Sequence, residues 1–378
     1  MFYVNMIKIL IITGSKQPGG AEKSAIKLAD SLGSYYSVTF GTLFQGNDDF
    51  YSSPSTNEIS FFKFTNIIRN FLPKFISMFV KYTLVPIDLL LMRRKIKNNN
   101  FDLVISFGAG VGCVTYLSLI FSNTPQITSE RISPDENVYR PSLVARLLRP
   151  WMYKHGVICS VQSKGFKDIV KSIWGIESFV TPNHFEIPNS TYFPQPSSSP
   201  CIAVGRPAPQ KGYDSLISAW VILESRINNE LWIVADDSDN YIKSLIKTYR
   251  VNNVKIKPLS NTLYEVYRGC SLFISTSRFE GYPNAIAEAI IFGIPVLTTA
   301  NSDVVNDWFE LGICQKIESL DSLQIANTVE NALKIENQLR SISKKAIETR
   351  SLFSWEHAKP YWDRVIFVAL KNRLDTIL

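Results

Sequence analysis

The chain has 378 residues, of which 46% are hydrophobic and 19% are charged. This composition excludes a disordered chain, and the length favours two domains of ordinary size. The net charge of +7 favours an anionic partner, such as a nucleotide, a nucleic acid or acidic lipid headgroups. The five cysteines stand singly, and only three histidines occur. We therefore expect reduced thiols in a cytoplasmic protein, with neither a disulfide framework nor a histidine metal cluster.

The first half of the chain alternates short apolar strands with amphipathic helical patterns. Residues 7–13 predict a buried strand rather than a signal peptide, because Lys8 interrupts the lead-in and a turn follows in place of a cleavage site. No window holds the roughly 18 uncharged apolar residues that a membrane-spanning helix needs. Further strands are predicted at residues 36–44, 101–107, 125–130, 156–161 and 178–183, and helices at 21–32 and 164–174.

The second half repeats this pattern after a stretch crowded with proline and serine, residues 187–200, which we interpret as a linker. Near-continuous apolar strands between amphipathic helices are typical of a parallel sheet covered on both faces. The sequence thus predicts two doubly wound α/β domains facing a central cleft, where open parallel sheets bind ligands. Strands are expected at residues 201–206, 231–236, 254–259, 272–277 and 295–299, and helices at 213–227, 241–250, 262–270, 284–293, 319–349 and 353–374.

The motif RFEGYPNAIAEAIIFG carries two acids, Glu280 in a turn after a predicted strand and Glu288 inside the following helix. Gly281 lets the backbone approach a ligand closely, and the N–H groups at a helix start suit an anion. Carboxylates beside such a site accept hydrogen bonds from sugar or ribose hydroxyls. The alternative is that Glu280 caps a turn and Glu288 is a solvated helix residue.

The motif VGRPAPQKG follows the first predicted strand of the second domain. Its cations, Arg206 and Lys211, suit a diphosphate, Arg through its planar fork and Lys as a point charge. The alternative is two loop cations in water. The run GSKQPGGAEK after the first strand of the chain places Gly14, Gly19 and Gly20 before a helix. This loop either admits a phosphate or sugar, or simply turns the chain.

The acidic run ADDSD follows another predicted strand and contains Asp236, Asp237 and Asp239. Such aspartates can hold a divalent metal that bridges a diphosphate. A polar loop is the favoured interpretation, because Arg206 and Lys211 already offer charge neutralisation.

Two further residues, Glu130 and Arg131, follow a predicted strand of the first domain and are candidates for the acceptor side. Around them, the first domain is basic and apolar. This pattern is typical of either a membrane-surface contact or solvated helix faces over an ordinary core. The cations in question are Lys63, Arg69, Lys74, Lys81, Arg93, Arg94, Lys95, Lys97, Arg140, Arg146, Arg149 and Lys154.

These motifs together resemble glycosyltransferase family 4, which comprises retaining enzymes of the GT-B fold. The resemblance runs through PGGAEK, FDLVISF, SER, Pro182–Asn183, VGRPAPQKG, the Glu280–Glu288 motif and a late FSW. The run SERISPDE is similar to the branch that builds bacterial capsule, exopolysaccharide or O-antigen. The resemblance implies an acceptor-side Rossmann-like domain at residues 1–190, a nucleotide-sugar donor domain at 191–355, and a C-terminal helix at 356–378 that packs back on the first domain.

The resemblance also implies roles for single residues. Arg206 and Lys211 would bind the donor diphosphate, Glu280 the sugar hydroxyls, and Glu288 the ribose. As catalytic residues it implies Glu280, Arg206 and Lys211, with Glu280 a positioner rather than a nucleophile. The other implied donor contacts are Gly19, Gly20, Gly205, Pro258, Leu259, Gly281, Tyr282, Pro283, Asn284 and Ala285.

The implied function is retaining transfer from a UDP- or GDP-sugar to a lipid-linked oligosaccharide. It would need no cofactor or obligatory metal, and it would take place on the cytoplasmic face of the inner membrane without nucleic acid. Two features depart from the family pattern: Ala235, Asp236 and Asp237 replace a usual glycine pair, and no histidine follows FDLVISF. The alternatives are a nucleotide-sugar epimerase or hydrolase on the same scaffold and a non-catalytic anion-binding protein.

Overall fold

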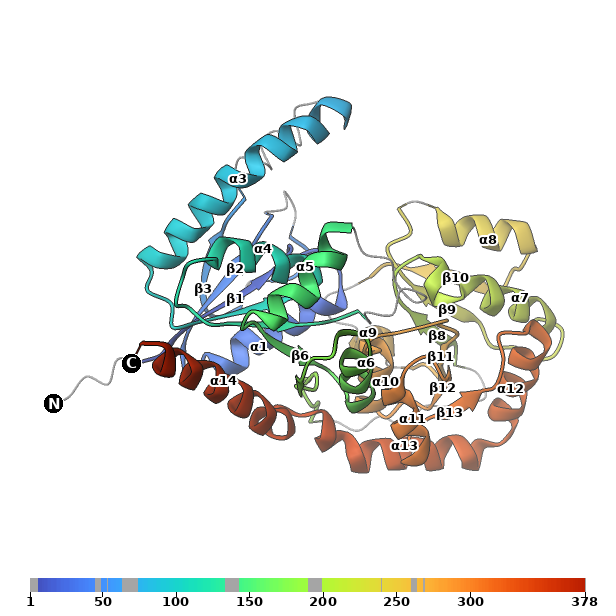
Figure 1. Cartoon of the computed structure of the whole chain (residues 1–378). Helices are drawn as coiled ribbons and strands as arrows, with labels where there is room; N and C mark the ends of the chain where they lie inside the picture. The colour runs from blue at the N-terminus through green and yellow to red at the C-terminus, as the bar shows by residue number, and fades with distance from the viewer. Residues whose placement is uncertain are drawn as a thin grey trace. The chain divides into compact units, whose positions relative to one another are not determined.

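The computed structural model describes residues 6–44, 49–52, 54–62, 74–132, 143–189, 199–238, 240–259, 264–267 and 269–377. The chain divides into two compact units (Figure 1). Unit 1 comprises Met1–His184 and Ala358–Leu378, and unit 2 comprises Phe185–His357. Of the predicted linker, residues 190–198 lie outside the described residues.

Unit 1 is built on a parallel sheet of seven strands in the order β3-β2-β1-β4-β5-β6-β7. The strand order reverses direction between β1 and β4, which is the signature of a doubly wound sheet. Strand β1 is fully buried apart from its first residue, as expected for a central strand. The strands are β1 Lys8–Thr13, β2 Ser37–Thr42, β3 Asn57–Ser60, β4 Leu103–Phe107, β5 Gln126–Ser129, β6 Ile158–Val161 and β7 Ser178–Val180.

Helices follow the strands of unit 1 and pack on its sheet. The last helix of the chain begins in unit 2 and continues into unit 1, where Trp362 stacks on Phe107 with ring centroids 6.3 Å apart. None of the helices, as far as they are described, has the length and apolar character needed to cross a membrane. The helices are α1 Gly20–Leu32, α3 Lys74–Asn98, α4 Ala109–Leu119, α5 Leu143–Lys154, α6 Lys164–Trp174 and α14 Trp355–Ile377.

Unit 2 repeats the arrangement with six parallel strands in the order β10-β9-β8-β11-β12-β13. The strands are β8 Cys201–Val204, β9 Leu231–Val234, β10 Val254–Lys257, β11 Leu272–Ser275, β12 Val296–Thr299 and β13 Gln315–Ile317. The α-helices are α7 Tyr213–Leu223, α8 Tyr241–Tyr249, α9 Tyr264–Tyr267, α10 Asn284–Ile291, α11 Asp303–Glu310, α12 Ser322–Lys334 and α13 Glu336–Thr349, with 3₁₀ turns at Pro209–Lys211 and Arg350–Phe353.

The sheet of unit 2 is covered on both faces by hydrophobic core. Successive residues of β11 point to opposite sides, so Phe273 joins one cluster with α10 and Ile274 joins the other with Trp220 of α7. This two-sided burial explains why the strands are apolar throughout, and it confirms the prediction of doubly wound α/β domains. The long helical region predicted at 319–349 is two helices, α12 and α13, which meet at Ile335 in a non-helical conformation.

Candidate active site

The predicted donor residues of unit 2 gather where three neighbouring strands end. Strands β8, β11 and β12 lie side by side, and each is followed by a loop at the carboxyl edge of the sheet. The loop after β8 contains the motif VGRPAPQKG, and the loop after β11 contains SRFEGYP. The second loop is also hydrogen-bonded to the end of β12, because Thr299 Oγ1 donates to the Ser277 carbonyl at 2.6 Å. The fold therefore brings two motifs from distant parts of the sequence to one edge.

An ion pair joins the two loops. Lys211 Nζ lies 2.6 Å from Glu280 Oε1, and the two side chains are only 18% and 11% exposed. Ser277 Oγ donates to the same Oε1 at 2.8 Å, and the Glu280 N–H donates to the Asn301 carbonyl at 2.9 Å. The carboxylate is thus fixed by a serine of its own turn and by a cation of the neighbouring loop. The Ser277 contact resembles the turn-capping alternative, and the Lys211 contact goes beyond it.

Two glycines make this pairing sterically possible. A Cβ at Gly205 would lie 2.9 Å from Lys211 Cε, so glycine leaves the space through which the lysine side chain runs. Gly212 has φ of +65°, and a Cβ there would lie 2.1 Å from the Thr276 carbonyl oxygen. Gly212 therefore lets α7 begin in close contact with the backbone after β11. Gly205 is among the predicted donor residues, whereas Gly212 is not.

Three further residues that the sequence did not single out tie the loops together. Gln210 Nε2 donates to the Phe279 carbonyl at 2.8 Å, and the Gln210 carbonyl accepts from the Arg278 N–H. The Arg278 guanidinium binds Asp214 through two bonds of 3.0 and 2.7 Å. Hydrogen bonding from Arg278 lowers the pKa of the Asp214 carboxyl. The only available signal was that these polar residues flank the predicted cation and acid in the sequence.

Helix α10 begins directly after the turn that carries Glu280 and Gly281. Its N-cap, Pro283, makes no side-chain capping bond, and the first N–H groups of a helix have no intrahelical partner. Glu288, one of its residues, is 7% exposed, so the alternative of a solvated helix residue is wrong for it. Burial, followed by the charge of Glu288, raises the pKa of Tyr267 well above its ordinary value, and Tyr267 donates to the Ala285 carbonyl at 3.3 Å.

The rest of the predicted turn packs against aromatic rings of unit 2. Tyr282 stacks on Phe185 with ring centroids 6.3 Å apart, and it meets Trp308 edge-on at 5.8 Å. Burial raises the pKa of Tyr282. The backbone of Gly281 to Ala285 is therefore held on a hydrophobic base, while its predicted contacts with sugar and phosphate stay predictions.

Other predicted residues of unit 2 lie at the same edge without direct contact to the ion pair. Arg206 is exposed, two residues after β8. Pro258 and Leu259 follow β10, and residues 260–263 lie outside the described part of the chain. Asp237 caps α8, because its two carboxylate oxygens accept from the N–H groups of Ile242 and Lys243 at 2.8 and 3.0 Å. Asp239 also lies outside the described residues.

Gly19 and Gly20 start α1 in unit 1. Gly19 is the N-cap, and a Cβ there would lie 2.0 Å from a Glu22 carboxylate oxygen, so glycine lets this side chain fold over the helix start. Both the N–H and the carbonyl of Gly19 lie 3.4 Å from the Tyr51 hydroxyl. Gly14 is the first residue of the loop between β1 and α1. A donor contact of Gly19 and Gly20 stays a prediction.

Glu130 is fully buried behind β5. Arg149 donates to its two oxygens at 3.1 and 2.8 Å, and Tyr153 donates to Oε1 at 2.5 Å. Burial, followed by the charge of Glu130, raises the pKa of Tyr153 well above its ordinary value. This network fastens α5 to β5. Arg149 is thus neither a membrane-facing nor a solvated cation: it is 1% exposed. An acceptor role for Glu130 stays a prediction.

Arg131 is held where β4, β5 and β7 end. Its guanidinium lies 4.4 Å from the centroid of the Phe107 ring, and Nη1 donates to Asn183. Burial lowers the pKa of Arg131 to about 9, against the opposing charge of Glu22. Its buried Nε–H has no partner among the residues that the structure describes. An acceptor contact there stays a prediction.

The chain is similar in sequence to known glycosyltransferases. Residues 198–349 match the family model described as Glycosyl transferases group 1. The chain is 24% identical to the amylovoran biosynthesis glycosyltransferase AmsD of Erwinia amylovora, over 80% of this chain and 84% of that protein. It is 22% identical to the GalNAc-α-(1→4)-GalNAc-α-(1→3)-diNAcBac-PP-undecaprenol α-1,4-N-acetyl-D-galactosaminyltransferase of Campylobacter jejuni, over 96% of this chain and 98% of that protein.

A solved structure shows the same architecture. HepE from Anabaena, in complex with UDP and glucose, superposes with a TM-score of 0.74 at 17% identity, covering 96% of this chain and 99% of that one. The fold is therefore the GT-B fold of two Rossmann-like α/β domains, as predicted. Assignment to family 4 within that fold stays a prediction.

Proposed function

We propose that the protein is a retaining glycosyltransferase that moves a sugar from a UDP- or GDP-sugar to a growing, lipid-linked glycan of a bacterial surface polysaccharide. The observation that carries this proposal is the Lys211–Glu280 pair at the carboxyl edge of the unit 2 sheet. The match of residues 198–349 to a glycosyltransferase family supports it. The UDP bound by HepE and the undecaprenol-linked glycan in the name of the Campylobacter relative support the choice of substrates.

Lys211 suits a diphosphate because Glu280 fixes the position of its ammonium group but uses only one of its hydrogen-bond donors. A lysine ammonium has three donors, and one of these reaches Glu280 at 2.6 Å. The remaining donors can meet phosphate oxygens together with the exposed Arg206 and the N-terminus of α10. Glu280 holds the ammonium at the sheet edge before the substrate arrives, so little side-chain ordering is left to binding.

The carboxylate suits a sugar because one of its oxygens stays available. The bonds from Lys211 and Ser277 both end on Oε1. Glu280 Oε2 has no partner among the residues that the structure describes, so it can accept a bond from a donor-sugar hydroxyl. The pair would thus bind both parts of a nucleotide sugar: Lys211 would contact the diphosphate, and Glu280 would accept hydrogen bonds from the sugar hydroxyls.

In the reaction, the bond between the sugar C1 and the diphosphate breaks while the acceptor oxygen bonds to C1 from the same face. The acceptor proton passes to the leaving phosphate oxygen, which balances the step without an enzymic nucleophile. Negative charge grows on the diphosphate as the bond breaks, and Lys211, Arg206 and the α10 N-terminus stabilise it. These groups remove the need for an obligatory metal, so transfer should persist in a chelator. Activity that is abolished by chelator and restored by Mg²⁺ or Mn²⁺ would contradict this.

The proposal is tested by incubating the protein with UDP- and GDP-sugars and bacterial membrane lipid extract. Nucleotide release and the mass gained by a lipid identify donor and acceptor. We expect Lys211→Met to weaken UDP or GDP binding by at least tenfold, and Glu280→Gln to lower turnover more than it lowers folding stability. Lys171→Met is the matched control, because it breaks an exposed 2.7 Å ion pair with Glu177 in unit 1. Failure of every nucleotide sugar to turn over, or unchanged nucleotide binding by Lys211→Met, would sink the proposal.

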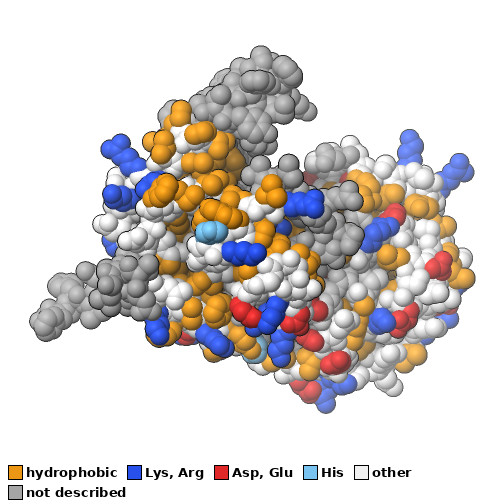
Figure 2. All heavy atoms as spheres, in the orientation of Figure 1, with side chains coloured by type: hydrophobic (Ala, Val, Ile, Leu, Met, Phe, Trp, Pro, Cys, Tyr) orange, Lys and Arg blue, Asp and Glu red, His pale blue; other side chains and the backbone are white. Residues whose placement is uncertain are grey.

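We also propose that unit 1 rests on the membrane that carries the acceptor. Helices α3, α4 and α5 pack side by side, and hydrophobic side chains gather over this region of the face seen in Figure 2. Phe121, after α4, is 90% exposed. Cations on the same helices could meet anionic headgroups while the apolar side chains enter the interface. The exposed apolar residues are Ile87, Leu90, Leu91, Leu117, Phe121, Leu147 and Trp151, and the exposed cations include Arg94, Lys97, Arg146 and Lys154.

Vesicle sedimentation tests this surface. The protein should bind vesicles that contain phosphatidylglycerol, and it should bind phosphatidylcholine vesicles at least tenfold more weakly. The double variant Leu90→Ser, Leu147→Ser should lose binding to both. Leu352→Ser is the control, because this leucine is 42% exposed on unit 2. Equal loss in the control, or no loss in the double variant, would argue against a membrane role for α3 and α5. Of the other cations considered from sequence, Lys63, Arg69 and Arg140 lie outside the described residues, as do the side chains of Lys74 and Lys81.

A further inference from the structure

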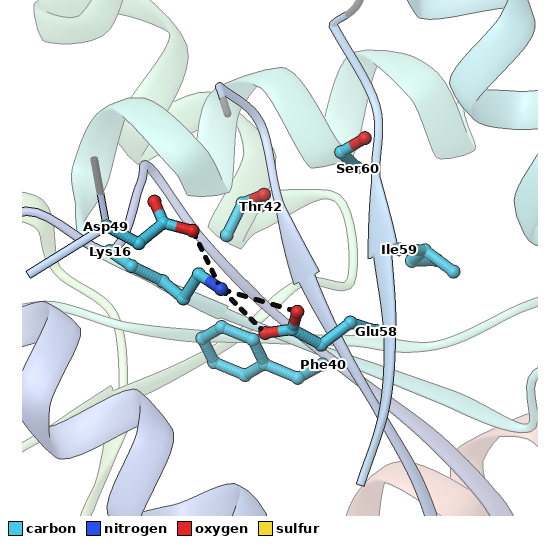
Figure 3. A pocket seen from close by; sticks show the side chains of 7 residues that line it. All are labelled: Lys16, Phe40, Thr42, Asp49, Glu58, Ile59 and Ser60. Carbon is cyan, nitrogen blue, oxygen red and sulfur yellow. Dashed lines mark hydrogen bonds and ion pairs between the residues drawn. The ribbon is translucent and has the colours of Figure 1, made fainter. Parts of the chain in front are cut away.

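Unit 1 contains a small polar pocket that the proposed donor site does not use. It has a volume of about 170 Å³ and lies beside the ends of β2 and β3 (Figure 3). At roughly 30 Å³ per water molecule, about five or six waters would fill it, which is the scale of one sugar ring. Its lining residues are Lys16, Phe40, Thr42, Asp49, Glu58, Ile59 and Ser60.

A lysine with two carboxylates dominates the pocket. Lys16 comes from the loop after β1, and its Nζ lies 2.8 Å from Asp49 Oδ2 and 3.1 Å from Glu58 Oε1. Figure 3 shows the ammonium between the two acids. Burial opposes the charge of Lys16, but the hydrogen bonds and charges of Asp49 and Glu58 outweigh it and raise its pKa. Among the described residues, the cluster therefore sets one lysine against two carboxylates.

The groups that face the pocket keep capacity for a ligand. The Lys16 side chain is only 11% exposed, whereas those of Asp49 and Glu58 are 26% and 35% exposed. The two acids are thus more accessible to solvent than the ammonium. Thr42 and Ser60 add hydroxyls from the strand ends, whereas the ring of Phe40 is fully buried. Carboxylates that accept and hydroxyls that donate or accept form the set that recognises a neutral, hydroxyl-rich ring.

We propose that this pocket binds one neutral sugar unit of the acceptor glycan, and that Asp49 and Glu58 select against acidic sugars. The inference rests on the proposed glycosyl transfer. It deepens that function by naming the class of acceptor unit. A sugar carboxylate would meet two negative charges against one positive charge, whereas sugar hydroxyls donate to those same oxygens. The pocket should therefore prefer neutral hexoses and N-acetylhexosamines to hexuronic acids by at least tenfold.

The direct test is NMR titration of the protein with methyl glycosides of neutral hexoses, N-acetylhexosamines and hexuronic acids. The backbone amide resonance of Ile59, which lies between Glu58 and Ser60 on the strand that lines the pocket, reports occupancy. We expect neutral glycosides to shift this resonance, and uronides to do so with at least tenfold weaker affinity. Glu58→Gln keeps the shape of the side chain and removes one negative charge, so it should narrow that gap to threefold or less. A purely structural ion pair would not change specificity in this way.

Lys171→Met serves again as the control and should leave the glycoside titrations unchanged. Should Glu58→Gln fail to fold, Asp49→Asn makes the same test from the other acid. Three results would overturn the inference. The wild type could bind uronides as tightly as neutral glycosides, or no glycoside could shift the Ile59 resonance. The tenfold difference in affinity between neutral glycosides and uronides could also persist in both variants. Donor turnover by the wild type separates the two proposals: if nucleotide is released and Ile59 does not respond, only the acceptor pocket is wrong.

Discussion

Two glycines with the same backbone conformation offer a sharp test of how the donor loops are held together. Gly212 and Gly175 both have φ of +65°, at ψ of 25° and 26°. At Gly175, after α6, an added Cβ meets nothing within 4 Å, whereas at Gly212 it meets the Thr276 carbonyl oxygen at 2.1 Å. An alanine costs about 1–2 kcal/mol at either site for its left-handed conformation. At Gly212 the clash forces the backbone after β11 to move, which adds about 1–3 kcal/mol.

We therefore expect Gly212→Ala to destabilise unit 2 by about 2–5 kcal/mol, which combines these two costs, and Gly175→Ala to destabilise unit 1 by about 1–2 kcal/mol. Urea unfolding with peptide-resolved hydrogen exchange over α7 and α6 reads the two units separately. Gly212→Ala should also weaken nucleotide binding, because Lys211 precedes it and depends on the same turn. Equal destabilisation by the two variants would refute the idea that contact with Thr276 fixes this loop.

Other predictions follow from buried groups. All five cysteines are buried, and burial raises their pKa values, to about 12 for Cys113. The native protein at pH 8 should therefore resist a thiol reagent that labels all five thiols once the protein is denatured. Rapid labelling of the native protein would contradict this. Glu130→Gln should lower the free energy of unfolding by about 3–5 kcal/mol in urea, because Arg149 would stay buried without its counter-charge, and a loss under 1 kcal/mol would argue against this. Asp237→Ala should cost about 0.5–2 kcal/mol by uncapping α8 while nucleotide binding persists; lost binding would favour a ligand role.

The strands were predictable because burial on both faces makes them apolar throughout. Strand β3 was not, because it is an edge strand of four residues, Asn57–Ser60, with three polar members. The three-residue edge strand β13, Gln315–Ile317, was missed as well. Helix α4 was missed for the opposite reason: it is apolar on all sides and contains two glycines, so it shows no amphipathic period. The break between α12 and α13 falls at Ile335 with neither glycine nor proline to signal it.

The site was predictable as a set of loops but not as a set of contacts. Lys211 and Glu280 are 69 residues apart, and each could be placed at a sheet edge from its position after a strand. Their pairing depends on β8 and β11 being neighbours, which is a property of strand order. The same limit applies to Arg149, whose basic, apolar surroundings looked like a surface. Its partner Glu130 lies 19 residues away on another element and draws it into the core.

The Lys211 and Lys16 sites share one arrangement, a lysine paired with carboxylates, but they differ in the number of carboxylates. In each unit a lysine from the loop after a central strand meets carboxylates carried by a neighbouring part of the same sheet. Lys211 meets one acid, so the pair is neutral, and the exposed Arg206 nearby makes the edge receptive to a diphosphate. Among the described residues, Lys16 meets two acids, so this pocket has a net negative formal charge and should repel a diphosphate. The number of charges therefore distinguishes the proposed donor site from the proposed sugar pocket. Glu58→Gln makes the Lys16 cluster neutral. It should therefore raise the affinity of that pocket for anionic glycosides and leave nucleotide binding in unit 2 unchanged.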